Sequence, residues 1–347
     1  MTLLEKLDGP GRRYGPGLLL SLAVALAATL VEPLLAGATG GRLSLPAMVI
    51  ALIIGIALFG LAAHPRFEPG ITYAVKTLLR YAIALLGLRV ALGDIVALGP
   101  GTVLLVLATM AITIVSAIWI ARLLGREAGY GALAGAANAV CGASATLATA
   151  TVVPDYKTKS ADIAFTVVMA NAVSTLVMLA YPPLCLALGL TPQETGLMLG
   201  LTIHDMAQVV GAGYAISDPV GNTAVIVKLF RVFLLLPVVL AIGWWFIRRG
   251  DTAGEARVPV PVFALVFLAL CVINSILPST PLAGLYAPVK TVLSEASKWG
   301  LLIAIAALGL GTSITAVLSI GWRHMAVFFG ATLVILVVGT GGIFLLR

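Results

Sequence analysis

The stretch GLLLSLAVALAATLVEPLLA, residues 17–36, contains a single charged side chain, Glu32. A run of this length crosses the roughly 30 Å hydrocarbon core of a bilayer as a helix. Lys6, Arg12 and Arg13 precede it, as basic residues precede the core of a signal peptide. The apolar stretch nevertheless exceeds the ~7 to 15 residues of such a core. We therefore predict a retained transmembrane helix.

The rest of the chain has the same character. Hydrophobic residues make up 61% of the 347 and charged residues 10%, against roughly 45–50% and 25% in soluble domains. Apolar runs near membrane length recur, without the alternating ten-residue segments of a β-barrel. The net charge of +7 is scattered without a basic cluster, which argues against nucleic-acid binding. The sequence predicts one all-α polytopic membrane domain over residues 1–347.

Proline, glycine and charge clusters divide the chain into eleven predicted transmembrane helices. Loops on the N-terminal side of these helices hold ten Lys and Arg against five on the other side, so the N-terminus is predicted to be cytoplasmic. Lys157 and Lys159 contradict this pattern, which indicates a miscounted or broken span between 129 and 188 and leaves the count at ten or eleven. The predicted helices are residues 16–35, 46–63, 72–92, 101–121, 129–150, 161–188, 193–216, 223–247, 259–277, 289–312 and 323–346.

Two stretches 222 residues apart resemble each other. ALLGLRVALGDIVALG begins at Ala84 and AALGLGTSITAVLSIG begins at Ala306. They place the third predicted helix against the tenth, so the two copies run in opposite directions, as in inverted-repeat transporters. Chance likeness between helices rich in Leu, Ala and Gly explains the match equally well.

The segment HDMAQ, residues 204–208, holds the acidic residue nearest the middle of a predicted span, Asp205. A charge there costs about 2.5–3.5 kcal/mol, so function is the default hypothesis. His204 beside it suits a proton relay, and Gln208 lies one turn further along. The alternative is a structural cluster that joins helices. A zinc motif H-E-x-x-H is excluded because Gln208 replaces the second His, and no metal is predicted.

A second polar segment is GALAGAANAVCGASATLA, residues 131–148. Gly142 is predicted to break the helix, so that freed backbone N–H groups and Ser144 bind an anion near the midplane. Close packing through small residues is the alternative. Nothing in the sequence gives Cys141 a catalytic base, and no P-loop or other cofactor motif occurs.

Cationic residues within predicted spans outnumber the acidic ones. Lys228 and Arg231 lie three residues apart and share a helix face, while Arg80 and Arg89 lie in the third span. Unpaired positive groups favour an anionic substrate, whereas snorkelling to the interface is the alternative.

Five ordered motifs resemble the YeiH-like family of bacterial inner-membrane proteins, to which sulfate export is ascribed. They are LLRYAIALLGLR, CGASATLA, HDMAQVVGAGYAIS, NTAVIVKLFRV and AALGLGTS. The resemblance covers nearly the whole chain and implies a panel domain, a core domain and two broken helices that cross near the midplane. It places a substrate or coupling site at Asn138, Cys141, Gly142, Ala143, Ser144, His204, Asp205, Gln208, Lys228, Arg231, Arg80 and Arg89. The family pattern favours Glu where this chain has Asp205.

The sequence therefore predicts a secondary transporter rather than an enzyme, without a cofactor, in the bacterial cytoplasmic membrane. It exports a small anion, sulfate or another sulfur oxyanion first, coupled to protons or sodium. Three alternatives stay open: a cation/proton antiporter that uses Asp205, an intramembrane enzyme that uses Cys141 or His204, and a sensory protein without transport. A homodimer is also left open.

Overall fold

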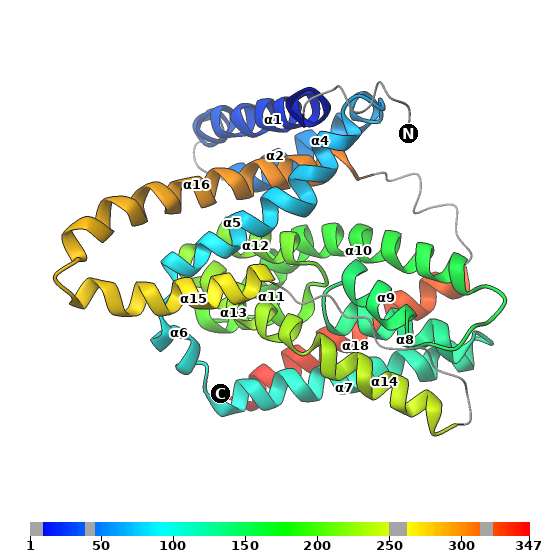
Figure 1. Cartoon of the computed structure of the whole chain (residues 1–347). Coiled ribbons are helices and arrows are strands. Elements are labelled where there is room, and N and C mark those ends of the chain that lie inside the picture. The colour runs from blue at the N-terminus through cyan, green and yellow to red at the C-terminus, as the bar shows by residue number, and fades with distance from the viewer. Residues whose placement is uncertain (1–9, 39–45, 250–261, 313–321) are drawn as a thin grey trace. The chain divides into compact units, whose positions relative to one another are not determined.

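The structure is a computed structural model that describes residues 10–38, 46–249, 262–312 and 322–347. Its described elements are all helices (Figure 1), so the predicted all-α polytopic class is confirmed. Eight helical segments are long and apolar enough to cross a membrane. They are Arg13–Leu35, Glu68–Arg89, Gly99–Leu123, Lys159–Ala187, Asp218–Ile247, Val262–Ser279, Ala283–Leu310 and Trp322–Leu345.

The residues gather into two compact units. One comprises Met1–Gly93 and Val262–Ser313, the other Asp94–Pro261 and Ile314–Arg347. The sequence predicted a single membrane domain and offered no boundary inside it. Each unit is described by itself.

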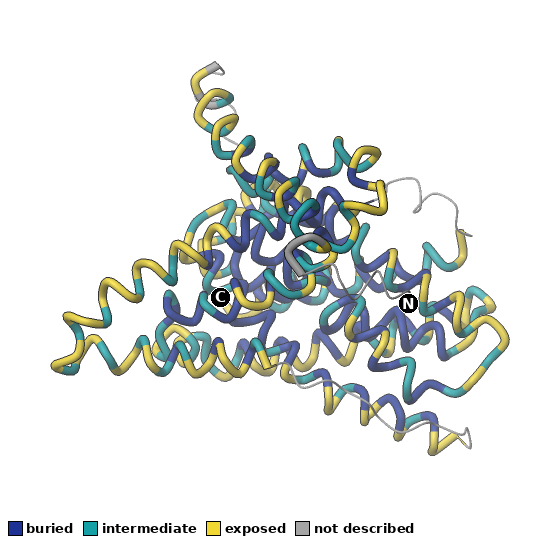
Figure 2. Tube along the Cα trace, turned by 45° about the horizontal axis from the view of Figure 1, so that its top comes forward, coloured by how far each residue is buried: buried dark blue, intermediate teal, exposed yellow. Residues whose placement is uncertain are grey.

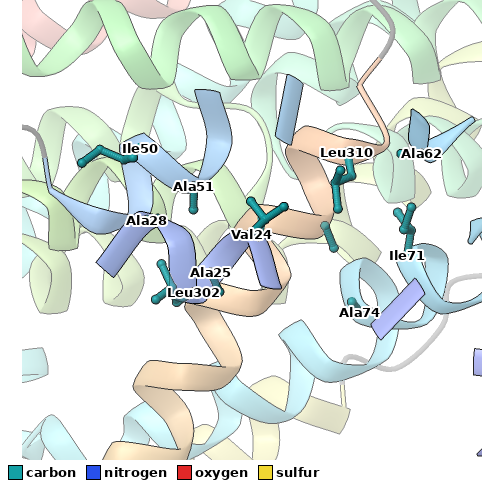
Figure 3. Packing of buried hydrophobic residues seen from close by; sticks show 12 residues of the cluster. Val24, Ala25, Ala28, Ile50, Ala51, Ala62, Ile71, Ala74, Leu302 and Leu310 are labelled. Atoms are coloured by element: carbon teal, nitrogen blue, oxygen red, sulfur yellow. The ribbon is translucent and has the colours of Figure 1, made fainter. Parts of the chain in front are cut away.

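The first unit packs through small residues. An ideal Cβ on Gly17 of α1 would lie only 2.7 Å from the Cα of Gly70 in α4, and one on Gly55 of α2 would lie 2.9 Å from the Cα of Gly309 in α16. Alanines and short aliphatic side chains fill the space between these helices (Figure 3). The helices are α1 (Pro10–Ala38), α2 (Ala47–Ala57), α3 (Phe59–Ala62), α4 (Glu68–Tyr73), η2 (Ala74–Leu78), α5 (Leu79–Leu85), η3 (Leu86–Arg89), α15 (Val262–Ile276), η4 (Leu277–Ser279) and α16 (Ala283–Leu310).

The second unit contains the polar segments that the sequence singled out. The residues of α8 from Gly129 to Ala139 are all buried; Figure 2 colours buried positions of the chain dark blue. After α6 (Leu92–Val96), which straddles the boundary, its helices are α7 (Gly99–Leu123), α8 (Ala128–Ala139), α9 (Ala143–Ala150), α10 (Lys159–Ala187), α11 (Pro192–Thr202), α12 (Met206–Ile216), α13 (Asp218–Phe233), α14 (Leu235–Ile247) and α18 (Trp322–Leu345).

Helices α8 and α9 form a re-entrant hairpin, called hairpin one. A Cβ on Gly129, at the start of α8, would lie 2.7 Å from the side chain of Val153 and 2.5 Å from that of Tyr156. Both of these residues follow α9, so the chain enters and leaves on the same side. The turn between the arms contains Gly142 with φ 63°, a conformation that favours glycine.

Helices α11 and α12 form a second re-entrant hairpin, hairpin two. Gly196 and Gly200 of α11 pack against Val220 and Ala224 of α13, so these two helices run in the same direction. Gly213, near the end of α12, packs against Gly221, near the start of α13. The chain therefore leaves hairpin two on the side where it entered.

The two hairpins start from opposite ends of α10. Hairpin one precedes the first residue of α10, Lys159, and hairpin two follows its last residue, Ala187. Since α10 is long enough to cross the membrane, the hairpins enter from opposite faces. The tips at 140–142 and 203–205 point toward each other.

The hairpins correct the predicted span count. Segments 129–150 and 193–216 each turn back rather than continue as one helix, so the count of eleven is not confirmed. A hydropathy pattern cannot separate a crossing from a turn of equal length. With α2 and α3 as one shorter pass, the described residues make nine passes, and Lys157 and Lys159 move to the same face as Arg126, which resolves the predicted conflict.

The two copies of the predicted repeat are still expected to run in opposite directions. Residues 99–123 shifted by 222 become 321–345, which matches α18 at Trp322–Leu345. Gly330 packs against Ile120 and Gly342 against Leu105, so α18 runs opposite to α7. Residues 313–321 of the repeat lie outside the described residues.

Candidate functional site

The tips of the two hairpins are joined by a lysine. The Lys228 ammonium, on α13, donates hydrogen bonds to the carbonyls of Val140 at 2.6 Å, Ile203 at 2.8 Å and His204 at 2.5 Å. Val140 belongs to tip one and the other two residues to tip two. A single buried cation thereby connects two segments that enter from opposite faces.

Arg231, one turn further along α13, binds the helices behind the tips. Its guanidinium donates to the carbonyls of Asn138 at 2.6 Å and Ala139 at 2.9 Å, at the end of α8. It also donates to Gly200 at 2.8 Å and Leu201 at 2.5 Å, at the end of α11. Carbonyls in the last turn of a helix lack helical partners, and a cation there complements the helix dipole.

We call Lys228 and Arg231 the cationic strut. Both side chains are fully buried, with 0% exposure, so they do not reach the interface as snorkelling would require. Their donors are directed at backbone carbonyls. Their predicted contact with substrate stays a prediction. Their hydrogen bonds join the two hairpins, a structural role that the sequence did not suggest.

His204, at tip two, is fully buried. It forms a hydrogen-bonded triad with Asn138 and Thr332. Asn138 donates through Nδ2 to the Ala134 carbonyl, which turns its Oδ1 toward His204 Nε2 at 2.6 Å. Thr332 Oγ1 lies 3.1 Å from the same nitrogen and 2.8 Å from Asn138 Oδ1. The imidazole therefore carries its hydrogen on Nε2. A second proton would add a third positive charge beside the strut.

A different side of the tips is open. Cys141, Asn171 and Asp205 are half-buried and Ser144 is exposed. Asp205 caps α12, because its Oδ1 accepts the Ala207 N–H at 3.0 Å. Its backbone N–H donates to Ser174 at 3.0 Å. These residues place a carboxylate, a thiol, a hydroxyl and an amide outside the fully buried core of this unit.

Tip one lies next to this carboxylate. A Cβ on Gly142 would lie 3.8 Å from Asp205 Oδ2. No side chain caps α9, whose N-cap is Gly142. The first turn of α9, with Ala143 and Ser144, therefore offers backbone donors beside an acid.

Gln208 is fully buried beside Asp205 and joins tip two to α10. Its Nε2 donates to Asn171 at 3.2 Å and Thr175 at 3.4 Å, while Oε1 is buried without a partner among the described residues. The sequence analysis missed Asn171, Ser174, Thr175 and Thr332. Three of them, at i, i+3 and i+4 of one membrane helix, form a polar face that could have been recognised.

The remaining predicted residues lie elsewhere. Arg80 is exposed in α5 and Arg89 is half-buried at the end of η3, both in the first unit. Within the described part of the chain, no group of three or more His, Cys, Asp or Glu side chains could hold a metal ion.

Comparison with known proteins identifies the family. Residues 16–328 match the model described as Conserved hypothetical protein 698. The UPF0324 membrane protein TauZ of Paracoccus pantotrophus is 42% identical over 306 residues, 87% of this chain and 88% of that protein. A UPF0324 membrane protein of Chlorobaculum tepidum is 38% identical over 333 residues, 94% and 89% of the two chains. No solved structure matches. The chain therefore belongs to the UPF0324 family of multi-pass membrane proteins, which is the YeiH-like family.

Proposed function

We propose that this protein is a secondary active transporter whose substrate binds between the hairpin tips. One observation carries the proposal: two re-entrant hairpins enter from opposite faces, and their tips are tied to a single helix by Lys228 and Arg231. Irregular backbone at membrane depth is tolerated where it lines a cavity or is buried in protein. A site at the meeting point of two such segments suits alternating access from the two sides.

The proposed substrate is a small anion, sulfate or another sulfur oxyanion. The uncapped start of α9 supplies backbone N–H groups and a positive helix end. Ser144 adds an exposed hydroxyl, and the strut contributes positive charge behind the tips. The Asp205 carboxylate beside Gly142 opposes an anion when it is ionised. A proton taken by Asp205 removes that repulsion, which couples proton binding to anion binding.

The proposed orientation has hairpin one at the cytoplasmic face. The membrane face that contains the ends of α7 and α14 and the starts of α10 and α18 is strongly basic, whereas the described residues at the opposite face of this unit contribute only Arg347. The positive-inside rule then places the basic face in the cytoplasm. Three passes precede α7, so the N-terminus is also cytoplasmic, and the membrane is the bacterial inner membrane. The basic residues are Arg122, Arg126, Lys157, Lys159, Arg248, Arg249 and Arg323.

A cation/proton antiporter is the second candidate, and two oxygen acceptors at tip two favour it. Asp205 and the unpartnered Oε1 of Gln208 are both oxygen ligands suited to a small hard cation. In this case Asp205 binds the ion directly, and sodium is the ion to try first.

Flux measurements on purified protein in proteoliposomes test the proposal. Sulfate movement should respond to an imposed pH gradient, and Asp205→Asn should abolish that response. Asn also caps helices, so the variant should remain folded. Asp218→Asn, at the exposed first residue of α13, is the matched control and should transport normally. Proton movement that depends on sodium but not on sulfate would favour the antiporter, and absence of both fluxes would refute transport.

A further inference from the structure

A titratable cluster lies at the base of hairpin one, remote from the tips along the chain. His324 Nε2, in the first turn of α18, lies 2.9 Å from Asp162 Oδ1, in the first turn of α10. Thr158 donates to the other carboxylate oxygen at 3.2 Å. The side chains of His324 and Asp162 are only 16% and 5% exposed. This pair takes no part in the proposed substrate site.

Hairpin one is attached to this pair through aromatic contacts. The Tyr130 ring of α8 packs edge-on against the His324 ring, with 4.7 Å between ring centroids. The Phe165 ring of α10 packs against His324 in the same way, with 5.4 Å between centroids. The Tyr130 hydroxyl donates to the His324 carbonyl at 2.7 Å. The cluster therefore joins the first arm of hairpin one to α10 and α18.

The first arm of hairpin one, α8, contacts α18 both at the base and near the tip, with the same sequence offset at each contact. Tyr130 bonds His324, and Asn138 bonds Thr332, so the separation along the chain is 194 residues in both pairs. The two contacts lie eight residues apart on α8 and on α18, about 12 Å along each helix. Helices α8 and α18 thus run parallel with one polar contact near each end. A shift at the base moves the partners of His204 at the tip.

We propose that the His324–Asp162 pair is a pH-sensitive latch on hairpin one. Histidine gains and loses its charge near neutral pH. When His324 is protonated, an imidazolium attracts the buried carboxylate and holds α18 and α8 against α10. When the pH rises and His324 becomes neutral, this attraction is lost and hairpin one can move. The latch is closed in acid and open in alkali.

Other titratable and charged groups surround the latch. The phenols of Tyr130 and Tyr156 face it, and burial together with Asp162 raises the pKa of Tyr156, so this phenol remains neutral. Arg126 and Glu127 precede α8, and Arg323 adjoins His324 in the chain. Lys159 is directed at Asp155 and the Val153 carbonyl, at 2.8 and 2.7 Å.

Cys141 provides a reporter at the tip that does not depend on transport. It is half-buried, whereas Cys185 and Cys271 are buried. We would measure its alkylation by a small neutral maleimide in wild type and in His324→Gln. Glutamine keeps a hydrogen bond to Asp162 but cannot become charged. Both proteins share the same pH dependence of maleimide chemistry, so their rate ratio isolates the latch.

The expected rate ratio depends on pH. His324→Gln should be alkylated severalfold faster than wild type near pH 6, and the rate ratio should fall toward one as the pH is raised to 8.5. His64→Gln, at an exposed histidine of the first unit, is the matched control and should match wild type throughout. A ratio that stays at one across this range, or a slower variant, would overturn the latch.

Asp162→Asn removes the other partner and should reproduce the same ratio, with no further increase in the double variant. If neither variant folds, hydrogen exchange of α8 in wild type gives the answer. After correction for intrinsic rates, exchange should accelerate between about pH 6 and 8.5. Unchanged protection would overturn the proposal even if sulfate transport is demonstrated.

Discussion

Hairpin one and hairpin two are built alike but end differently. In each, the first arm carries two glycines four residues apart that bring it close to a membrane-crossing helix. Gly131 and Gly135 lie against Ala117 of α7, while Gly196 and Gly200 lie against α13. Such spacing lets two helix backbones approach closely. The arms therefore follow one plan, and the chemical difference is confined to the tips.

Tip one presents donors and tip two presents an acid. Tip one turns through Gly142 and leaves the start of α9 uncapped. Tip two turns through extended backbone at Asp205, φ −103°, whose carboxylate caps α12. In the proposed mechanism one hairpin receives the anion and the other controls the local charge. Each prediction below removes, transfers or tests one part of this difference.

The largest loss of stability should follow removal of Arg231, the part of the cationic strut that binds the first arms of both hairpins. Arg231→Met leaves carbonyls of Asn138, Ala139, Gly200 and Leu201 without their donor. Each buried unsatisfied group costs about 1–3 kcal/mol, so the total exceeds several kcal/mol. We expect little folded protein, read by thermal unfolding in detergent. Arg80→Met, at an exposed arginine, is the control, and a wild-type melting temperature for Arg231→Met would show that the strut is dispensable.

The next effect concerns the turn that only hairpin one requires. Gly142 has φ 63° and ψ −120°, which costs another residue about 1–3 kcal/mol. Gly142→Ala should therefore lower stability and also displace tip one, so that sulfate flux falls. Gly189→Ala also places a side chain at a positive φ, 62°, with open space around the new methyl group. It should melt earlier but transport normally. Equal flux in both variants would remove Gly142 from the site.

A third test gives hairpin one the acid that hairpin two has. Ser144→Asp places a carboxylate in the first turn of α9, where a negative charge stabilises a helix by about 0.3–1 kcal/mol. The variant should melt slightly later than wild type while it loses anion flux, because its own carboxylate occupies the anion position. Ser144→Ala should retain most flux. Full sulfate flux in Ser144→Asp would refute an anion site at this helix end.

The sequence predicted these tips better than it predicted their topology. Asp205 stood out because a midspan acid is costly, and Gly142 because glycine interrupts a helix. Both lie at tips in the structure. Re-entry was not predictable from hydropathy, since 129–150 has the length of a crossing, although Lys157 and Lys159 gave warning of it.

The partners of the strut could not be predicted from the sequence for a related reason. Lys228 and Arg231 appeared to be unpaired because the sequence offers too few membrane acids. Their partners are backbone carbonyls, and every sequence supplies these equally. Helix ends that bind a distant cation become visible only when the chain is folded. Thr332 was missed because a single hydroxyl in a membrane helix carries little signal.

The smallest effect concerns the bases of the hairpins. At hairpin two the base is held by Glu194 and Arg347, with Nε to Oε1 at 2.5 Å and Nη2 to Oε2 at 2.8 Å. The Arg347 guanidinium, together with the Thr191 N–H, lowers the pKa of Glu194 to about 2. A carboxylate with a lowered pKa stabilises the fold above its unfolded value near 4.3, and this is lost only as the pH falls toward 2.

The Glu194–Arg347 ion pair should therefore keep both charges from about pH 5 to 8. This is the range in which the proposed His324–Asp162 latch responds to protons. Glu194→Gln should lower stability by about 0–1 kcal/mol, as for partly exposed ion pairs, by the same amount at each pH in that range. The difference in melting temperature between wild type and variant, measured across this range, checks the expectation. A difference that grows or shrinks with pH would show that hairpin two also responds to protons at its base. The contrast between a pH-sensitive base in hairpin one and a pH-insensitive base in hairpin two would then be lost.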